Sequence, residues 1–248
     1  DVHAGLGLAF KGDARAGGLR QTVDIVSLDA KAVFDLLTHR SFRFRFCHGK
    51  ESRIQCAQLF GRNMDLEYTF NQAVQLIPRN YAYKNHITNE DCQTKYAILG
   101  MGILLGDEKH PTLADGVNEK GLACAGLNFP DYIKYEPSAV EGKNNIAPYD
   151  VIFWILGNFS SIEELREPLN NLNIVEKTFD ATTPLPTLHW IIKDKTDACL
   201  VVEAAKDKLR IYENHIGVLT NPPCFDWHID HLNQYVELSS YQAEDTSW

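Results

Sequence analysis

Residues 60–65 read Phe-Gly-Arg-Asn-Met-Asp, so an arginine and a carboxylate stand three positions apart at the end of an alternating run. Cys47 lies 14 positions before Gly61 (61 − 47), about the length of one hairpin. If the two arms of that hairpin pair, Arg62 and Asp65 lie close to the Cys47 sulfur. A nearby cation favours the thiolate, which is the nucleophilic form of cysteine. An ordinary surface ion pair beside a small buried cysteine fits the same spacing.

Composition bounds the possible functions. A chain of 248 residues, with 44% hydrophobic and 23% charged residues, can bury one substantial core. Its formal charge of −9 argues against a nucleic-acid partner, which needs clustered lysine and arginine. The longest apolar runs, such as residues 98–105, are strand-sized and broken by glycine, so no membrane span is expected.

The cysteines form neither a CxxC pair nor a cluster with histidine at metal-ligand spacing, and they stand at positions 47, 56, 92, 124, 199 and 224. This scatter predicts reduced thiols in a cytoplasmic protein, not a disulfide framework or a zinc site. The glycines near the N-terminus form no GxGxxG motif after a strand. We therefore expect no metal and no cofactor.

The residue pattern changes near position 47, which predicts a boundary. Residues 1–46 are crowded with glycine at the start, then offer a short possible helix within 23–37 and an alternating strand over 41–46. Beyond them, two groups of strands flank two helices, which predicts a layered α+β domain. The predicted strands cover residues 58–60, 72–78, 96–105, 122–129, 189–193, 198–204 and 209–212, the predicted helices cover 145–158 and 160–172, and a tight hairpin turn is predicted at 117–121.

Six motifs in order carry a family resemblance. They are Gly61-Arg62-Asn63-Met64-Asp65, Ile77-Pro78-Arg79-Asn80, Asn118-Glu119-Lys120-Gly121-Leu122, Ala125-Gly126-Leu127-Asn128-Phe129-Pro130, Leu188-His189-Trp190 and Val218-Leu219-Thr220-Asn221-Pro222. Together they resemble the choloylglycine hydrolase family, which includes bile salt hydrolases and penicillin V acylases. The similarity runs from about Cys47 to Trp248.

The resemblance implies an N-terminal nucleophile hydrolase fold, a four-layer αββα sandwich, over residues 47–248. Family members continue well beyond the position that matches Trp248, with further strands and another active-site arginine. The sandwich is therefore expected to be incomplete at the C-terminus. Residues 1–46 resemble nothing in the family and are expected to be an extension, either a pro-segment or non-native sequence. The resemblance also implies a homotetramer.

The family hydrolyses amides with the thiol of a chain-terminal cysteine. Cys47 is the predicted nucleophile, and Cys56, on the returning arm of the hairpin, is the alternative. Because this chemistry needs a free α-amine, the bond between Phe46 and Cys47 has to be cleaved first. By analogy, Arg62 favours the thiolate, and Asp65 accepts hydrogen bonds from the α-amine that shuttles the proton.

Two asparagines complete the predicted site. Asn128 and Asn221 match family asparagines whose amides stabilise the tetrahedral oxyanion and position the scissile amide. Bile salt hydrolases tend to carry asparagine where penicillin V acylases carry tyrosine, so Asn128 favours glycine- or taurine-conjugated bile salts as the small-molecule substrate. A penicillin V acylase-type amidase and an inactive homologue are the alternatives. A steroid needs an apolar pocket, and the predicted lining residues are Leu66, Tyr68, Phe70 and Phe129.

Overall fold

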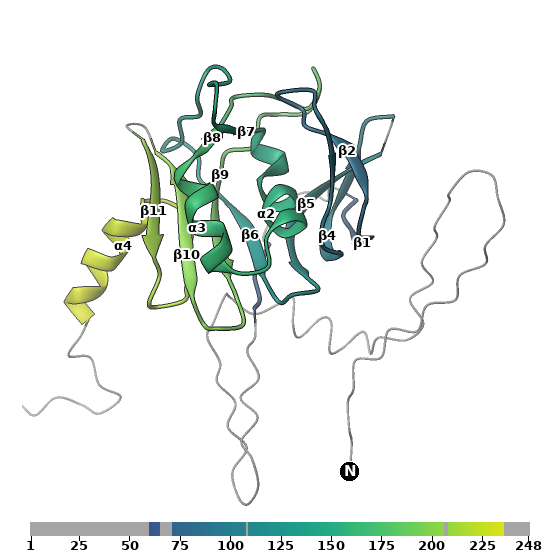
Figure 1. The fold of residues 1–248 in the computed structure, drawn as a ribbon. Helices are drawn as coiled ribbons and strands as arrows, with labels where there is room; N and C mark the ends of the chain where they lie inside the picture. Colours follow the sequence, from purple (N-terminus) through teal and green to yellow (C-terminus); the bar gives the residue numbers. More distant parts are fainter. Residues whose placement is uncertain (1–59, 65–70, 108, 206–207, 236–248) are drawn as a thin grey trace, which may run out of the picture.

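The computed structural model describes residues 60–64, 71–107, 109–205 and 208–235 (Figure 1). The strands are β1 (Ala73–Ile77), β2 (Ala82–Lys84), β3 (Asp91–Gln93), β4 (Ile98–Leu105), β5 (His110–Asn118), β6 (Ala123–Asn128), β7 (Asn144–Ile146), β8 (Leu172–Ile174), β9 (Leu188–Lys193), β10 (Cys199–Ala204) and β11 (Leu209–Glu213). The helices are η1 (Pro148–Asp150), α2 (Val151–Asn158), α3 (Ile162–Asn170), α4 (Phe225–Leu232) and η2 (Asn233–Tyr235).

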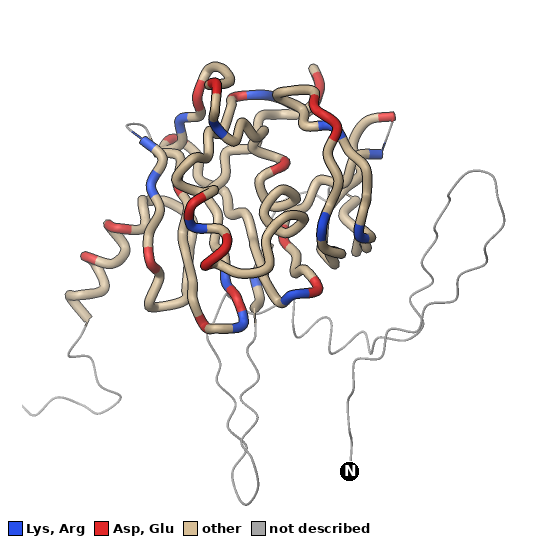
Figure 2. Tube along the Cα trace, in the orientation of Figure 1, with Lys and Arg blue, Asp and Glu red and all other residues tan. Residues whose placement is uncertain are grey.

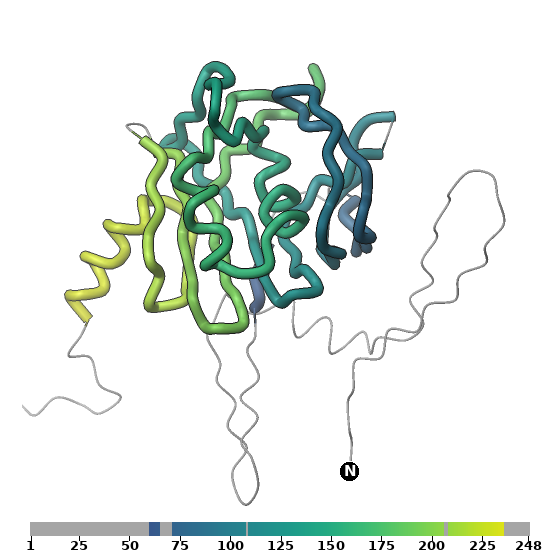
Figure 3. Tube along the Cα trace, viewed as in Figure 1, coloured from purple at the N-terminus to yellow at the C-terminus, as the bar shows by residue number. Residues whose placement is uncertain are grey.

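Seven strands form one antiparallel sheet in the order β1-β4-β5-β6-β9-β10-β11. The early strands and the late strands are two local meanders, which occupy opposite sides of the molecule in Figure 3. They are joined where β6 pairs with β9, and the chain between these two strands carries α2 and α3. β2 pairs with β3 in a separate hairpin, and β7 pairs with β8 in parallel.

Apolar side chains cover both faces of this sheet. On one face, α2 buries Phe153, Ile155 and Leu156 in a cluster with Ile98 and Trp190. A smaller cluster on the other face contains Ala125, Ile191, Cys199, Val201, Leu219 and Phe225. Each residue of β10 is buried, as expected for a strand covered on both sides. The described residues therefore form one sheet and one layer of helices. These are two of the four layers predicted for the sandwich.

Most of the predicted elements are confirmed, with one clear error. The strands predicted at 72–78, 96–105, 122–129, 189–193, 198–204 and 209–212, and the helix at 160–172, correspond to β1, β4, β6, β9, β10, β11 and α3. The helix predicted from residue 145 begins only at Val151, because Asn145 lies in β7 and its side chain binds the backbone of Val140. Pro148 then starts η1, where its missing N–H costs nothing. The elements predicted within 23–37 and 41–46 lie outside the described residues. Of the strand predicted at 58–60 only Phe60 is described, and it belongs to no strand.

The predicted hairpin turn is held by the side chain of Asn118, which is 3% exposed. Its amide nitrogen donates to the carbonyl oxygens of Leu156 (2.9 Å) and Phe159 (2.7 Å). Its oxygen accepts from the backbone nitrogens of Lys120 (3.0 Å) and Leu122 (3.1 Å). One side chain thus fastens the β5–β6 turn to the end of α2.

Replacing Asn118 with alanine is expected to lower the free energy of unfolding by about 2–4 kcal/mol, because each buried partner left unsatisfied costs roughly 1–3 kcal/mol. Urea unfolding measures the loss. The matched control is Asn170→Ala at an exposed position of α3, expected to change stability by less than about 0.5 kcal/mol. Equal effects of the two substitutions would contradict the role of Asn118.

Glu119, the next residue in the turn, gives a pH-dependent prediction. A hydrogen bond from Arg79 lowers the pKa of Glu119 to about 2, from an ordinary value of 4.5. Because the folded-state pKa is the lower one, the pair stabilises the fold above pH 4.5 and loses its effect as the pH falls towards 2. Glu119→Gln should therefore lower the urea midpoint at pH 7 and lower it less at about pH 3. An equal difference at both pH values would refute this assignment.

Lysine and arginine are interspersed with acidic residues along the described part of the chain (Figure 2). None of the described helices has both the length and the apolar character needed to cross a membrane.

Candidate active site

Arg62 lies against the sheet, where its Nη1 donates to the carbonyl oxygen of Ala114 at 2.8 Å. Its Nε lies 3.8 Å from an Asp115 carboxylate oxygen, and the two side chains are 12% and 18% exposed. In register, Asp115 pairs with Ala125, a member of the smaller cluster. Because cross-strand partners point to the same face, Arg62 lies on the face opposite to α2.

Burial dominates the electrostatics of this pair. Desolvation lowers the pKa of Arg62, and the charge of Asp115 offsets part of that effect. Desolvation likewise raises the pKa of Asp115, and Arg62 works against it. Arginine keeps its charge in either case. The site therefore holds a partly dehydrated cation whose Nε has no hydrogen-bond partner among the described residues.

Asn128 is the last residue of β6 and is exposed. Its Oδ1 accepts a hydrogen bond from the Thr187 hydroxyl at 3.1 Å, and its backbone pairs with Leu188 of β9. Asn128 stands three residues beyond Ala125 on the same strand, which is about 10 Å at the rise of a β-strand. Asn128, the predicted oxyanion donor, is thus at the end of β6, and β6 also pairs with Asp115, the ion-pair partner of Arg62.

Asn221 lies in the loop between β11 and α4 and is exposed. The loop is ordered by Asn214, which accepts from the Gly217 nitrogen (2.8 Å) and donates to the Val218 carbonyl oxygen (3.0 Å). The carbonyl oxygen of Asn221 contacts Nε2 of His228 on α4 at 3.1 Å. This contact with His228 therefore connects the Asn221 backbone to α4.

A buried pair that the sequence did not predict links the two asparagines. Nδ1 of His189 lies 3.0 Å from Oε1 of Glu203, and both side chains are fully buried. The same carboxylate accepts from the Phe225 nitrogen at 3.0 and 3.2 Å, and the His189 ring faces the backbone of Thr220. Burial lowers the pKa of His189 despite its carboxylate partner. Thr220, which precedes Asn221, therefore contacts His189 on β9. His189 follows Leu188, the residue that pairs with Asn128 in the sheet.

Phe129 is 0% exposed and stacks on His189 with ring centroids 4.2 Å apart. The structure thus places it in the support of the site, and its role in lining a substrate pocket stays a prediction. Cys47, Cys56 and Asp65 lie outside the described residues, as do the predicted pocket residues Leu66, Tyr68 and Phe70. Of the predicted catalytic residues, Arg62, Asn128 and Asn221 are described, and the sheet places all three around β5, β6 and the β11–α4 loop.

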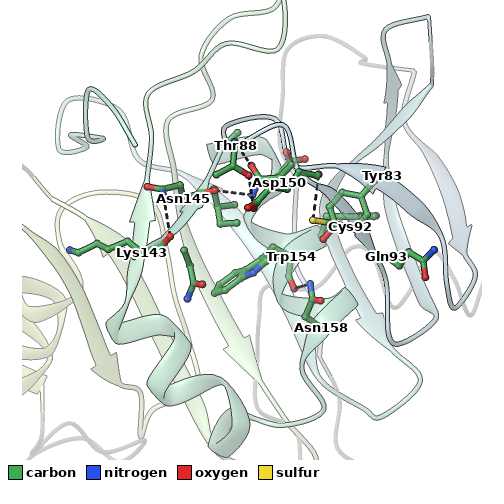
Figure 4. A pocket seen from close by; sticks show the side chains of 15 residues that line it. Tyr83, Thr88, Cys92, Gln93, Lys143, Asn145, Asp150, Trp154 and Asn158 are labelled. Carbon is green, nitrogen blue, oxygen red and sulfur yellow. Dashed lines mark hydrogen bonds between the residues drawn. The ribbon is translucent and has the colours of Figure 1, made fainter. Parts of the chain in front are cut away.

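A cavity of about 300 Å³ lies elsewhere, between α2 and the small sheets (Figure 4). Its walls include Tyr83, Asn85, Asn145, Asp150 and Trp154. None of the described catalytic candidates lines it, so it is separate from the predicted amide site.

Comparison with known proteins gives a consistent set of relatives. A family model described as linear amide C-N hydrolases, choloylglycine hydrolase family, matches residues 52–248. A bile salt hydrolase/transferase of Clostridium perfringens is 52% identical over 187 residues, covering 75% of this chain and 56% of the relative. A conjugated bile acid hydrolase of Lactobacillus gasseri is 35% identical over 189 residues, covering 76% and 59%. The chain thus spans little more than half the length of these curated relatives.

Solved structures agree with this result. A cysteine-to-alanine mutant of the conjugated bile acid hydrolase from Clostridium perfringens matches with a TM-score of 0.71 at 52% identity, covering 77% of this chain and 57% of that one. A penicillin V acylase from Agrobacterium tumefaciens matches with a TM-score of 0.57 at 21% identity, covering 72% and 53%, which is a likeness in fold alone. These likenesses confirm the predicted α+β class of N-terminal nucleophile hydrolases.

Proposed function

The chain belongs to the choloylglycine hydrolase family of linear amide C–N hydrolases, and on that basis we propose that it hydrolyses the amide bond of glycine- or taurine-conjugated bile salts. The observation that carries the proposal is the 52% identity to a bile salt hydrolase/transferase, combined with the buried Arg62 on the same side of the sheet as the smaller cluster. Asn128, at the position that tends to be tyrosine in penicillin V acylases, supports the bile-salt substrate.

The proposed reaction uses a cysteine thiolate. The sulfur attacks the amide carbonyl, and the resulting oxyanion is stabilised by the side-chain amides of Asn128 and Asn221. The C–N bond then breaks, and the leaving nitrogen takes the proton held by the cysteine α-amine, which Asp65 orients. Water attacks the thioester that remains, releasing the free bile acid and regenerating the thiolate. No oxidant, reductant or cofactor enters this sequence.

Two cysteines are candidates for the nucleophile. Cys47 lies 14 positions before Gly61, one residue short of the spacing of about 15 that the family resemblance implies, and it acts only if the preceding peptide bond is cleaved. The family match begins at residue 52, so Cys56 lies within it and Cys47 lies five residues before it (52 − 47). We propose Cys47, because moving the thiol to the returning arm of the hairpin changes its strand, whereas a loop one residue shorter is easily absorbed.

Arg62→Leu is expected to lower kcat/KM by about 100-fold or more, a loss comparable to that of one oxyanion donor. Removing the cation should also raise the pKa of the nucleophilic thiol, so the pH profile of its alkylation should move to higher pH. Arg79→Leu, at a 63% exposed arginine, is the matched control and should leave both measurements unchanged. An unchanged alkylation profile in Arg62→Leu would contradict the proposed contact with the thiolate.

The test of function is release of glycine or taurine from conjugated bile salts, compared with cleavage of penicillin V, using the full chain and quantified by mass spectrometry. Faster turnover of bile salts supports the proposal, and faster cleavage of penicillin V supports the acylase alternative. If neither amide is cleaved by chains that begin at the nucleophilic cysteine, the inactive homologue is the correct reading. Intact mass in the same samples identifies the first residue.

Location and assembly complete the proposal. We place the protein in the cytoplasm, which agrees with the free thiols of Cys92 and Cys124. The family resemblance suggests a homotetramer, and light scattering of the purified chain measures its mass.

A further inference from the structure

Three side chains from distant parts of the chain meet on the helical face of the sheet. His86 lies between β2 and β3, His110 is the first residue of β5, and Asp150 ends η1 directly before α2. Nδ1 of His86 lies 2.6 Å from Oδ2 of Asp150, and Nε2 of His110 lies 2.6 Å from Oδ1. One potential ligand atom from each residue can be chosen so that all three lie within 4.8 Å of one another.

The surroundings of this cluster are dry and aromatic. The side chains of His110 and Asp150 are each 8% exposed, and that of His86 is 26% exposed. The rings of Tyr149, Phe153 and Phe179 pack against the two histidines. A carboxylate removed from water needs a compensating positive charge or hydrogen bonds.

The two histidines determine the ionisation of Asp150. Burial works to raise the pKa of Asp150, but hydrogen bonds from His110 and His86 outweigh it, and the pKa is lowered overall. The carboxylate is therefore anionic at neutral pH. It faces one ring nitrogen of each of two histidines, and a neutral imidazole nitrogen becomes a metal ligand when its proton is lost or moved to the other ring nitrogen.

We propose that His86, His110 and Asp150 bind one Zn²⁺ or a similar late first-row divalent cation. Two imidazole nitrogens and a carboxylate oxygen are a zinc donor set, whereas Mg²⁺ and Ca²⁺ prefer oxygen ligands alone. In a tetrahedral zinc site with bonds near 2.0–2.2 Å, neighbouring ligand atoms lie about 3.3 Å apart. The two His–Asp separations of 2.6 Å have to lengthen by about 0.7 Å to reach that distance, and the longest separation among the ligand atoms, at most 4.8 Å, has to shorten by up to about 1.5 Å. The ion replaces the protons in the two hydrogen bonds.

A cavity borders the proposed site on its Asp150 side, and neither His86 nor His110 lines it. Asp150, Asn85 and Phe153 line that cavity, and Figure 4 shows Asp150 among the residues at its wall. A water molecule in the cavity can occupy the open coordination position. Nζ of Lys177 donates to the backbone carbonyl oxygen of His86 at 2.6 Å.

The expected role of the ion is structural. β2 and β3 have three residues each, with exposed positions at both ends, and the ring of Tyr83 in the middle of β2 packs against Phe153 of α2. An ion bound to His86 would fasten the hairpin to β5 and to the start of α2. The site lies with α2, on the opposite face of the sheet from Arg62, so the inference does not depend on amide hydrolysis.

The test is metal binding by the full chain after chelation and dialysis, with all thiols first blocked by iodoacetamide because cysteines also bind zinc. We expect one Zn²⁺ per chain by calorimetry, a rise in melting temperature with ZnCl₂ but not with MgCl₂, and a visible tetrahedral spectrum when Co²⁺ is added. His86→Ala should weaken Zn²⁺ binding by about 10-fold or more. His86 is the variant of choice because it is the most exposed of the three ligands.

His215→Ala is the matched control, since His215 is an exposed histidine in the turn after β11 and should leave Zn²⁺ binding unchanged. Circular dichroism verifies that both variants are folded. Equal affinity for Zn²⁺ in the wild type and His86→Ala, or no zinc-dependent rise in melting temperature in the wild type, would overturn the proposal. The cobalt spectrum of the wild type tests the same site without any substitution.

Discussion

Cys47→Ala is expected to reduce release of glycine or taurine from conjugated bile salts by at least about 10³-fold, because the substitution removes the proposed nucleophile that forms the acyl-enzyme. Folding should be unaffected, since an alanine replaces a small side chain. The measurement is amine release under single-turnover conditions, together with trapping of the acylated cysteine by mass spectrometry. In the wild type the trapped acyl group should be on the peptide that begins with Cys47.

Cys56→Ala is the matched control, because it removes a thiol nine residues away on the predicted returning arm (56 − 47). It should retain activity within about tenfold of the wild type. Loss of activity in Cys56→Ala alone, with Cys47→Ala active, would assign the nucleophile to Cys56. Activity in an intact chain that still carries Phe46 would contradict the role proposed for the free α-amine.

Glu203→Ala is expected to lower the free energy of unfolding by about 2–4 kcal/mol, because each buried partner left unsatisfied costs roughly 1–3 kcal/mol. The substitution leaves the Phe225 N–H and the His189 ring without their shared acceptor in a fully buried place. Because this carboxylate also fixes the start of α4, we expect the loop that carries Asn221 to lose order. Urea unfolding and hydrogen exchange of that loop measure the two effects.

Glu213→Gln is the control for Glu203→Ala, since Glu213 ends the neighbouring strand, is 46% exposed and pairs with Arg166 at the surface. It should cost less than about 1 kcal/mol, as exposed ion pairs do. Glu203→Gln should recover part of the loss, because its amide oxygen can still accept from Phe225. A cost below about 1 kcal/mol for Glu203→Ala would show that the buried pair is not needed for stability.

Periodicity predicted most of the sheet, because β4, β6, β9 and β10 are long enough for apolar residues to show a pattern. It did not predict β2, β3, β7 and β8, which have three residues each and too few positions for a period. It also missed β5, a nine-residue strand in which buried and partly buried positions do not alternate. α4 was also missed, since Phe225 is its one buried residue and the polar residues around it look like a loop. The start of α2 was misplaced because the buried side chain of Asn145 determines the local structure, and no local propensity reveals that.

Motifs identified the candidate site, whereas spacing alone left Cys47 and Arg62 ambiguous. What the sequence could not give are the contacts between distant residues. His189 and Glu203 are 14 positions apart on adjacent strands, and only the register of β9 with β10 brings them together. His86, His110 and Asp150 are separated by 24 and 40 positions, so no metal-ligand spacing is visible. The histidine of the Leu-His-Trp motif was the one available signal for the buried pair.

The pairing of β6 with β9 has a consequence for the order of folding. Its residue pairs are separated by 60 positions at Asn128–Leu188 and 70 at Ala123–Lys193, whereas the other pairs of neighbouring strands in each half of the sheet are closer in sequence. Long-range contacts form late, because the entropy of closing the loop is lost before the contacts compensate for it. Asn128 lies on β6, and His189, which contacts the loop that carries Asn221, lies on β9. We therefore expect the two proposed oxyanion donors, Asn128 and Asn221, to be aligned only when β6 pairs with β9.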